Sequence, residues 1–532
     1  MSLVAREVGE IPAAVKGWGE ARLTPDNVYR VIGDHLAEVL RDEQFAGLYE
    51  RTGRHAIAPS VLALVTLFQH LEQIPDREAA VLVVSRLDWK YALHLPLEDA
   101  GFDYRDLCHF RARLLAHGAE RLVFEEVLGA IQRLGFLKKR GKQRTDALAV
   151  LGAVRELSER ELVSETLRLA VRDLEAADPI WLGQAVNASF REQYAHTRGD
   201  YQLSAPERAR QLLQVGADGY WLLDRLAQGP AGLRTLPAVT LLGEVWAQHF
   251  TRAADQVQVR PHTVPCTELI VTPHDPGVRA GQKRGKRWRG EKVHITETAE
   301  PGGPNFLTDV TTSNASSGDT EALPAIRAHL AAQDLLPAEQ FVDSGYISGQ
   351  QLAQSQAMGI ELVGPARADT SPQEFKLDDF PINHAARQAI CPHEQVSVKW
   401  RRHTERDGSQ AVQIQFAATT CAACPLRARC TTSTSGRSLH LNEHHHLLVA
   451  RRAEAQTAAF RLRMHARPAI EATLSELVRR HGLRRHRYRG DRKRHLENLL
   501  KAAACNLKRL ARALAARLRT VGVPAQPLAA AA

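Results

Sequence analysis

Hydrophobic positions in the first quarter of the chain recur at helical spacing. Across Asn27–Arg41, apolar residues fall three or four positions apart, which predicts a helix with one buried face. Pro59 stands where the first turn of a helix tolerates proline, directly before the apolar stripe Val61–Leu71. Asp76 is placed to cap a further helix that continues through Tyr91. This succession of short helices fits a helix-turn-helix DNA reader, and a plain helical bundle explains the same periodicity.

The pattern changes to strands in the middle of the chain. A basic run, Leu137–Arg144, leads into Asp146 and the apolar stretch Ala147–Val154. From Glu268 onward, short β-rich segments are separated by Gly, Pro and Asp, and one helix, Glu321–Ala332, intervenes. This alternation predicts an α/β sheet. The expected strands are Leu269–Thr272, Lys292–Thr298, Phe306–Thr312, Gln340–Val342 and Ile360–Val363.

Helical periodicity returns before and after this sheet. Residues 155–262 carry no turn-rich strand signal and are expected to form a helical insertion. Two C-terminal helices are expected at Ala450–Arg480 and Arg494–Leu518. The expected organisation is an N-terminal arm (1–24), a helical DNA-binding domain (25–135), a first core strand (136–154), the helical insertion (155–265), the α/β core (266–390), a cysteine module (391–435), a segment with a glutamate helix, a basic tract and a C-terminal helix (436–518), and a disordered tail (519–532).

The composition is that of a globular protein with a polyanionic partner. Of 532 residues, 44% are hydrophobic and 24% are charged, which is enough to build a sizeable core. No apolar run approaches the ~18 residues that span a bilayer, and the N-terminus lacks the apolar region of a signal peptide. We therefore expect a soluble, cytoplasmic protein. The net charge of +10 favours nucleic acid as the partner, because each phosphate contact releases counterions.

Three carboxylates have positions that suit a shared metal site. Asp146 lies beside an expected strand, Asp343 ends another, and Glu471 lies on an expected helix. Two acids at strand ends and one on a packing helix can converge on two divalent ions, the arrangement that phosphodiester chemistry uses. Carboxylate oxygens suit Mg²⁺, and Mn²⁺ is possible. Taken singly, each acid is one of 60 Asp and Glu residues and fits a surface charge equally well.

The helix that carries Glu471 has an apolar stripe formed by Ile470, Leu474, Leu477 and Val478. Glu471 falls at the edge of that stripe, so its side chain is expected to face the sheet rather than bulk water. Arg467, four residues earlier, lies on the same face. An ordinary ion pair between these two residues is the alternative interpretation of this spacing.

Basic residues gather on the C-terminal side of Glu471. Residues 479–494 contain nine Lys or Arg and a single acid, with Tyr488 interleaved. Such a tract can neutralise phosphates and stack on unpaired bases, and a solvated charged face is the alternative. A second basic group, 283–288, includes Arg284 and has the same interpretation. From these tracts the residues expected to contact DNA are Arg479, Arg484, Arg485, Arg487, Tyr488, Arg489, Lys493, Lys286, Arg287 and Trp288.

The seven cysteines argue against a disulfide framework in a chain of this length. Cys421 and Cys424 have the spacing of a metal knuckle, Cys430 follows, and Cys391 precedes them. Four thiolates predict one structural Zn²⁺ in a closed site, with His393 as a possible substitute ligand. Reduced cysteines without metal, or a redox pair at Cys421 and Cys424, are the alternatives. The remaining three are expected to be small buried residues: Cys108, Cys266 and Cys505.

Several short motifs lie between residues 76 and 490, within a resemblance that covers roughly residues 25–515. They are Asp76–Ala79, Trp89–Leu93, Phe110–Leu114, Thr272–Pro276, Trp288–His294, Val342–Tyr346, Arg467–Glu471 and Leu483–Gly490. Together these motifs resemble those of bacterial insertion-sequence transposases of the DDE type. The resemblance implies an RNase H-like catalytic domain in which Asp146, Asp343 and Glu471 hold metal ions, and it extends to the cysteine module. It also adds Arg467 and Lys292 to the expected DNA contacts.

The resemblance implies cleavage at the ends of an insertion element and joining to target DNA. Water and then a 3′-hydroxyl would be the nucleophiles, and a nucleoid-associated homodimer would bring two terminal inverted repeats together. The chain departs from the family at three places. Ala147 follows the first aspartate where Ser is common, and Met464 and Val478 replace the Tyr and Lys of the glutamate signature. A decayed transposase that only binds DNA, and a structure-specific nuclease, remain the alternatives.

Overall fold

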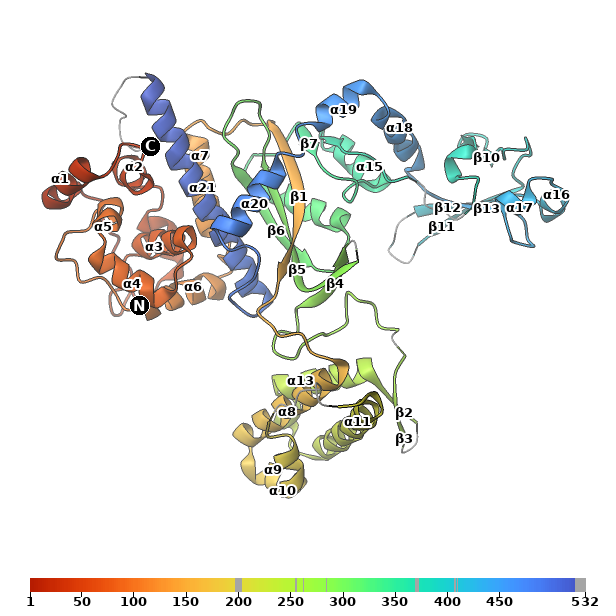
Figure 1. Ribbon diagram of the computed structural model, residues 1–532, viewed down its shortest axis with the longest axis horizontal. Helices are drawn as coiled ribbons and strands as arrows, with labels where there is room; N and C mark the ends of the chain where they lie inside the picture. Colours follow the sequence, from red (N-terminus) through yellow and green to blue (C-terminus); the bar gives the residue numbers. More distant parts are fainter. Residues whose placement is uncertain are drawn as a thin grey trace.

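The computed structural model describes residues 1–196, 203–253, 256–261, 263–283, 285–368, 373–405, 408 and 410–521. Arg284 and the tail beyond residue 521 lie outside these ranges. Figure 1 shows the N-terminal helices on one side of a central sheet, the helical insertion below the sheet, and the small cysteine module on the opposite side. Within the described residues, no helix is both long enough and apolar enough to cross a membrane.

The N-terminal region is helical, as the periodicity predicts. Asn27 caps α2, because its side chain accepts hydrogen bonds from the amides of Tyr29 and Arg30. That helix ends at His35 instead of Arg41. The described helices are α1 (Ala13–Arg22), α2 (Val28–His35), η1 (Asp42–Leu48), α3 (Pro59–Glu72), α4 (Asp76–Ser85), α5 (Leu87–Leu93), α6 (Tyr104–Ala116) and α7 (Leu122–Arg133).

The expected cap at Asp76 is wrong. Asp76 is the first residue of α4, and its carboxylate accepts instead from the guanidinium of Arg111, 2.5 Å away, and from Gln69. The single helix expected through Tyr91 is also interrupted, because Arg86 adopts an extended conformation between α4 and α5. The ion pair with Arg111 joins α4 to α6, which is a tertiary role that local capping rules do not anticipate.

The central sheet is mixed, and β1 lies in its middle. β1 pairs antiparallel with β5 and parallel with β7, in the order β4-β5-β1-β7-β8, while β6 pairs with β5. The strands are β1 (Lys142–Leu151), β4 (Arg279–Lys283), β5 (Lys286–Thr298), β6 (Leu307–Asn314), β7 (Glu339–Phe341) and β8 (Glu361–Val363), with η2 (Asp319–Ala322), α14 (Leu323–Ala332) and α15 (Gly349–Ala357) between them.

One expected strand, Leu269–Thr272, is not a strand. Side chains form hydrogen bonds with its backbone groups, which in a sheet would bond to a neighbouring strand. The amide of Ile270 donates to the side chain of Gln248, and Arg289 donates to the carbonyl oxygen of Val271. The segment therefore links the insertion to the sheet without joining it.

The insertion has a hydrophobic core of its own, which includes Leu167, Leu222, Trp246 and Phe250. It also contains a two-stranded hairpin that the sequence pattern did not predict. Its elements are α8 (Glu159–Ala177), α9 (Pro179–Ala185), α10 (Ala188–Gln193), α11 (Ala205–Gln228), α12 (Ala231–Arg234), α13 (Pro237–His249), β2 (Phe250–Ala253) and β3 (Gln256–Val259).

The cysteine module is built on a three-stranded antiparallel sheet, β11-β12-β13. Ile414, Phe416, Leu439 and Leu441 form a separate small core beneath it. Its elements are η3 (Leu377–Asp379), β9 (Ile382–Asn383), β10 (Gln388–Ala389), β11 (Lys399–Thr404), β12 (Gln410–Gln415), α16 (Ala418–Ala422), α17 (Arg427–Cys430) and β13 (Ser438–Asn442).

The long helix expected at Ala450–Arg480 is three helices. They are α18 (His445–Ala455), α19 (Ala458–Met464) and α20 (Ile470–Arg480). Thr457 caps α19, and Pro468 lies in the break before α20 because proline cannot continue a helix from the preceding turn. The last helix, α21 (Asp491–Val521), runs three residues into the expected disordered tail.

Helix α21 joins the N-terminal region to the sheet. It packs against α3, α7 and β6, and Figure 1 shows it passing between the N-terminal helices and the sheet. One hydrophobic cluster consequently continues from Val31 and Phe68 through Leu499 to Val293 and Val310. Cys505 is buried in this cluster as expected, but Cys108 and Cys266 are exposed, so the expected burial of those two is wrong.

Candidate active site

Neighbouring parallel strands bring the two aspartates together. Arg144 on β1 is in register with Phe341, the last residue of β7. Asp146 lies two residues further along β1, and Asp343 lies two residues beyond the end of β7. Glu471, in the first turn of α20, lines the same groove, whose volume is 840 Å³. The three acids that the sequence pattern singled out therefore share one site, although they are 197 and 128 residues apart in the chain (343 − 146 and 471 − 343).

Arg467 lies among these three acids. Its Nη2 is 2.6 Å from Oδ2 of Asp146 and 3.9 Å from Oδ2 of Asp343. Its Nη1 is 3.9 Å from Oε1 of Glu471. The ion pair between Arg467 and Glu471, which the helical spacing suggested, is thus one of the longer contacts. The short contact joins Arg467 to Asp146 on β1.

The three acids differ in their surroundings. The Asp146 side chain is only 9% exposed, and this burial raises its pKa; Arg467 opposes the shift, while Asp343 adds to it. Glu471 is 70% exposed, so the expectation that it faces the sheet is wrong. The buried stripe of α20 is Ile470, Thr473 and Leu477, and Glu471 points away from that stripe into the open groove.

The turn that carries Asp343 is held by a buried polar pair. The Tyr346 hydroxyl lies 2.7 Å from Nδ1 of His294 on β5, and Nε2 of that ring lies 2.8 Å from the Ser313 hydroxyl on β6. Burial lowers the pKa of His294 to about 4, so the ring is neutral near pH 7. Both residues lie inside the sequence motifs of the family, yet sequence reasoning assigned neither of them a role.

Gly345 lets this turn close tightly. Its amide donates to Oδ1 of Asp343 at 2.7 Å. A Cβ atom at this position would come within 2.6 Å of an Asp319 oxygen and 2.8 Å of an Asp343 oxygen, so a side chain here would displace these carboxylates. Asp319 is therefore a further acid beside the site that sequence reasoning missed. It pairs with Lys292, 2.9 Å away, so Lys292 is engaged inside the protein and does not line the groove.

Comparison with family models matches two segments of the chain to transposase domains. A model described as Transposase DDE domain matches residues 390–511, which include Glu471, and a model described as Transposase domain (DUF772) matches residues 19–113. These two matches support an insertion-sequence DDE transposase. Its function is DNA transposition, and like other transposases it binds DNA. Searches among curated proteins and solved structures found no match.

A buried polar network holds α20 of the transposase against the sheet. Glu297 on β5 is fully buried and lies 2.6 Å from Nε of Arg144 on β1. Its other oxygen accepts from the Thr473 hydroxyl on α20 at 2.6 Å and lies 3.3 Å from Arg509 on α21. One carboxylate thus ties four elements together directly behind the acids.

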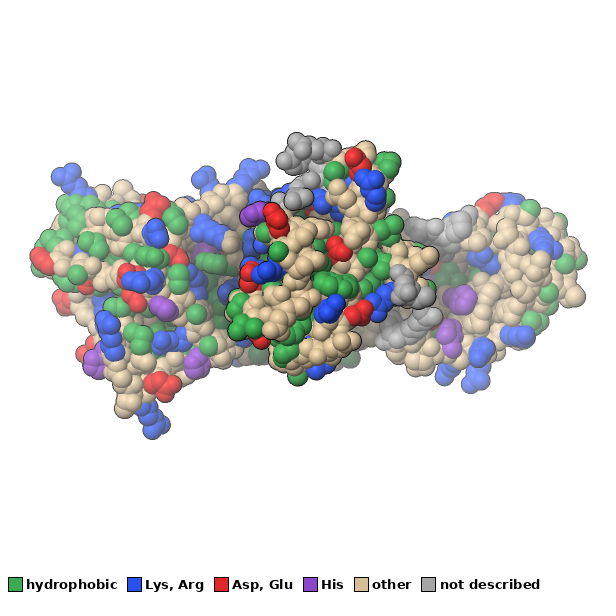
Figure 2. Space-filling view, turned by 90° about the horizontal axis from the view of Figure 1, so that it is seen from below, with side chains coloured by type: hydrophobic (Ala, Val, Ile, Leu, Met, Phe, Trp, Pro, Cys, Tyr) green, Lys and Arg blue, Asp and Glu red, His purple; other side chains and the backbone are tan. Residues whose placement is uncertain are grey.

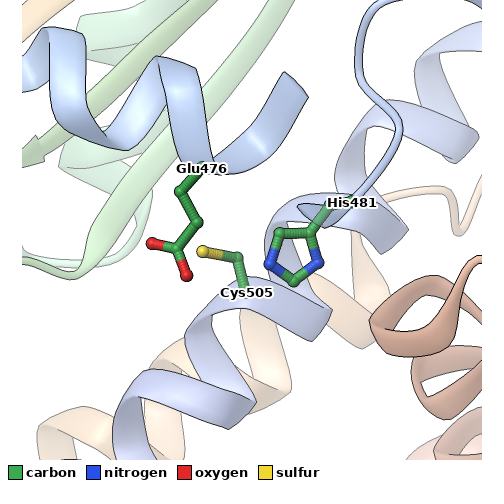
Figure 3. A group of neighbouring side chains, drawn as sticks. All are labelled: Glu476, His481 and Cys505. Carbon is green, nitrogen blue, oxygen red and sulfur yellow. The ribbon is translucent and has the colours of Figure 1, made fainter. Parts of the chain in front are cut away.

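A second cluster lies between α20 and α21, formed by Glu476, His481 and Cys505 (Figure 3). In the part of the chain that the structure describes, it is the one group of three possible metal ligands whose ligand atoms all lie within 4.8 Å of one another. Lys508 and Arg509 already neutralise Glu476, and Nζ of Lys508 lies 3.4 Å from Nε2 of His481. Cations so near disfavour a metal ion, and we assign the cluster to helix packing.

The basic tract of the transposase divides into two parts. Arg479, Arg480, Arg484 and Arg485 are exposed, and Arg484 lines the groove. The other part makes contacts within the protein, although Arg487, Arg489 and Arg492 are also exposed. Arg487 donates to the carbonyl oxygens of Gln73 and Ile74, Tyr488 packs under Arg111, Arg489 donates to Ala153, Arg492 pairs with Glu120, and Arg494 is fully buried with Asp275, Glu291 and Asp491.

The second basic group lies at the mouth of the groove. Lys283, Lys286, Arg287 and Trp288 line it from the β4–β5 hairpin. The Trp288 ring lies against Gly281, where an added Cβ would come within 2.3 Å of the ring. By contrast, Figure 2 shows Lys and Arg dispersed among Asp and Glu over the insertion face. Lys283, Lys286 and Arg287 stand beside the acids, where a polyanion would need them.

All four clustered cysteines line one cavity of 30 Å³, between β10 and the two short helices α16 and α17. The amides of Gln395 and Arg437 each lie 3.4 Å from a cysteine sulfur, those of Cys391 and Cys421. Burial raises the pKa of Cys430; Arg437 opposes this shift, and the other three cysteines add to it. Thiolates are ligands that zinc prefers, but amide donors reach only two of the four sulfurs. In the part of the chain that the structure describes, no three of these sulfurs all lie within 4.8 Å of one another, so they are more widely spaced than in a closed zinc site. His393 does not line this cavity.

Proposed function

We propose that the transposase cuts DNA at the ends of an insertion element and joins those ends to target DNA, with Asp146, Asp343 and Glu471 as the ligands of two Mg²⁺ ions. One observation carries the proposal. Acids from β1, the end of β7 and α20 meet in a single groove that basic residues line. Carboxylate oxygens are the donors that Mg²⁺ prefers, and Mn²⁺ suits the same set.

The proposed catalytic domain is RNase H-like. The mixed sheet supports this, with β1 in its centre, antiparallel β5 on one side and parallel β7 and β8 on the other. This arrangement sets two carboxylates side by side on a rigid surface. The network around Glu297 then fixes the helix that carries the third acid.

Within this site the chain's own residues bind and orient the DNA. Bound divalent ions supply the charge that activates the attacking oxygen and stabilises the leaving oxygen. Tyr346 and His294 hold the Asp343 turn in place from inside the protein. Water and then the DNA 3′-hydroxyl are the nucleophiles, so no covalent bond to the protein is formed.

We propose that DNA contacts come from residues that line the groove and from exposed cations whose side chains, among the described residues, make no hydrogen bond or ion pair within the protein. They are Arg467, Arg479, Arg484, Arg485, Lys493, Lys286, Arg287 and Trp288. Arg487, Tyr488, Arg489 and Lys292 make contacts within the protein, so we reassign them to holding the fold. The N-terminal helices are proposed to read the terminal repeat, and a homodimer is proposed to pair two ends.

We further propose that Cys391, Cys421, Cys424 and Cys430 hold one structural Zn²⁺. The shared cavity and the two amide-to-sulfur contacts support this proposal. A closed set of four thiolates suits folding rather than catalysis. The metal would stabilise a module whose own hydrophobic core is small.

The test uses the DNA that flanks the gene as substrate. Purified protein with Mg²⁺ and a labelled duplex carrying the flanking inverted repeat should give both a nicked end and a product joined to target DNA. Nicking without joining would identify a structure-specific nuclease. Binding without nicking, in Mg²⁺ and in Mn²⁺, would identify a decayed transposase; the departures at Ala147, beside Asp146, and at Met464 motivate that alternative.

A further inference from the structure

A single guanidinium reaches all three acids of the proposed metal site. Nη2 of Arg467 lies 2.6 Å from Asp146 and 3.9 Å from Asp343, and Nη1 lies 3.9 Å from Glu471. We propose that Arg467 is an internal cation that fills this site before metal binds, and that a DNA phosphate draws it away so that metal can load. The inference rests on the proposed function, because it requires these acids to be metal ligands.

Electrostatics explains why a cation stands there. Asp146 is almost fully buried and lies near Asp343, and both facts disfavour its negative charge. Arg467 compensates that charge. A divalent ion held by the same carboxylates would lie beside the guanidinium, and two cations at such a separation repel strongly where solvent is scarce. Metal and Arg467 therefore compete for the acids.

The position of Arg467 allows it to move. It stands between α19 and α20, and its side chain lines the open groove, into which the guanidinium can rotate. Within the described residues, its buried Nε has no hydrogen-bond partner, so this guanidinium is not fully satisfied where it lies. Its side chain is 19% exposed, on the groove side.

The groove offers a destination for the released side chain. Lys283, Lys286, Arg287 and Arg484 line it, so a DNA backbone there would bring phosphate oxygens close to Arg467. A planar guanidinium binds phosphate through two parallel hydrogen bonds. DNA binding and metal binding would then favour one another, and linkage requires the same factor in both directions. Metal would load on the DNA-bound protein, where the substrate is present.

The test measures metal binding without DNA and without catalysis. Free Mn²⁺ is counted by electron paramagnetic resonance during titration of the full-length protein. Arg467→Gln should bind Mn²⁺ about fivefold or more tightly than the wild type, at the lower end of typical couplings between sites. Arg467→Lys, whose ammonium cannot bridge three carboxylates, should fall between the two. Arg463→Gln is the matched control, because Arg463 pairs with Glu339 and Glu361 outside the groove.

The Mn²⁺ titrations can overturn the proposed role of Arg467 in several ways. Unchanged or weaker Mn²⁺ binding by Arg467→Gln would overturn the proposal, as would absence of binding in both proteins. Should circular dichroism show that Arg467→Gln is unfolded, the Arg467→Lys titration decides, and wild-type affinity there would overturn it. A double variant, Asp146→Asn with Asp343→Asn, is titrated separately. If it binds Mn²⁺ as the wild type does, the acids are not the ligands, and the proposed function itself fails.

Discussion

The Tyr346 hydroxyl lies 2.7 Å from Nδ1 of His294, and this pair connects the Asp343 turn to the two strands on the far side of β1. Both side chains are fully buried, so neither can exchange its partner for water. Because Tyr346 is three residues from Asp343, its bond to His294 fixes where that carboxylate lies, without touching the substrate.

Tyr346→Phe should therefore impair Mg²⁺-dependent cleavage more than it lowers the stability of the fold. We expect DNA cleavage to require several-fold more Mg²⁺, and the free energy of unfolding to fall by about 1–3 kcal/mol, because a buried ring nitrogen loses its partner. Cleavage rate is measured against Mg²⁺ concentration. Tyr220→Phe is the matched control, since its hydroxyl bonds a carbonyl oxygen in the insertion. A wild-type Mg²⁺ profile for Tyr346→Phe would show that the pair does not position Asp343.

Low pH should weaken the ion pairs between Glu476 on α20 and the basic residues of α21. Burial alone would raise the pKa of Glu476, but Lys508 and Arg509 outweigh it and lower the pKa to about 2, from an ordinary 4.5. A carboxyl whose pKa falls on folding stabilises the folded state above its unfolded pKa. That stability, about 3 kcal/mol, is then lost as pH drops from about 4.5 toward 2.

Urea unfolding of the wild type and of Glu476→Gln between pH 7.5 and 3 tests this. The difference in free energy of unfolding between the two proteins should be largest near neutral pH and should decrease below pH 4.5. Glu374→Gln, which breaks an exposed ion pair with Arg429, should leave stability nearly unchanged. A gap between wild type and Glu476→Gln that stays constant with pH would contradict the assignment.

The two parts of the basic tract should respond differently to neutralisation. Replacing Arg484 and Arg485 with Ala removes two exposed cations beside the groove, so the slope of log affinity against log salt should fall by about 0.9 for each phosphate that is no longer neutralised. Arg487→Ala should leave that slope unchanged and lower stability, because this guanidinium ties the tract to Gln73 and Ile74. Fluorescence anisotropy with a labelled duplex at several salt concentrations measures both, and equal effects on the slope would refute the division.

Zinc should depend on the clustered cysteines alone. Metal analysis of gently purified protein should find about one zinc per chain, and Cys421→Ser with Cys424→Ser should lose it and expose the module to protease. Cys266→Ser is the control, because that cysteine is exposed and does not line the cavity. If the wild-type protein is well folded without zinc, the four clustered cysteines are not a structural zinc site.

Local patterns predicted the elements better than the interactions between them. Alternation and turn residues located β1, β5 and β6, and the site followed from strand ends, because adjacent parallel strands bring Asp146 and Asp343 together. The sequence pattern did not predict the two breaks that separate α18, α19 and α20. The apolar spacing continues through both breaks, whereas the cap of each helix depends on only one or two residues.

The interactions that define the site depend on residues far apart in the chain. Arg467 reaches Asp146 across 321 positions, and Glu297 joins strands to two C-terminal helices. No spacing rule reports such pairs. For the same reason the basic tract looked uniform in sequence, although tertiary partners engage about half of it.

The three acids are the centre of this account, and conservative substitution tests them most directly. Asp146→Asn, Asp343→Asn and Glu471→Gln each keep the shape of the side chain and remove a metal-binding charge. Mg²⁺-dependent cleavage of element-end DNA is measured for each variant, with DNA binding measured alongside and with Asp334→Asn as an exposed control outside the groove. The account predicts that all three lose cleavage and retain DNA binding, while the control cleaves normally. Cleavage near the wild-type rate by any one of the three would contradict it.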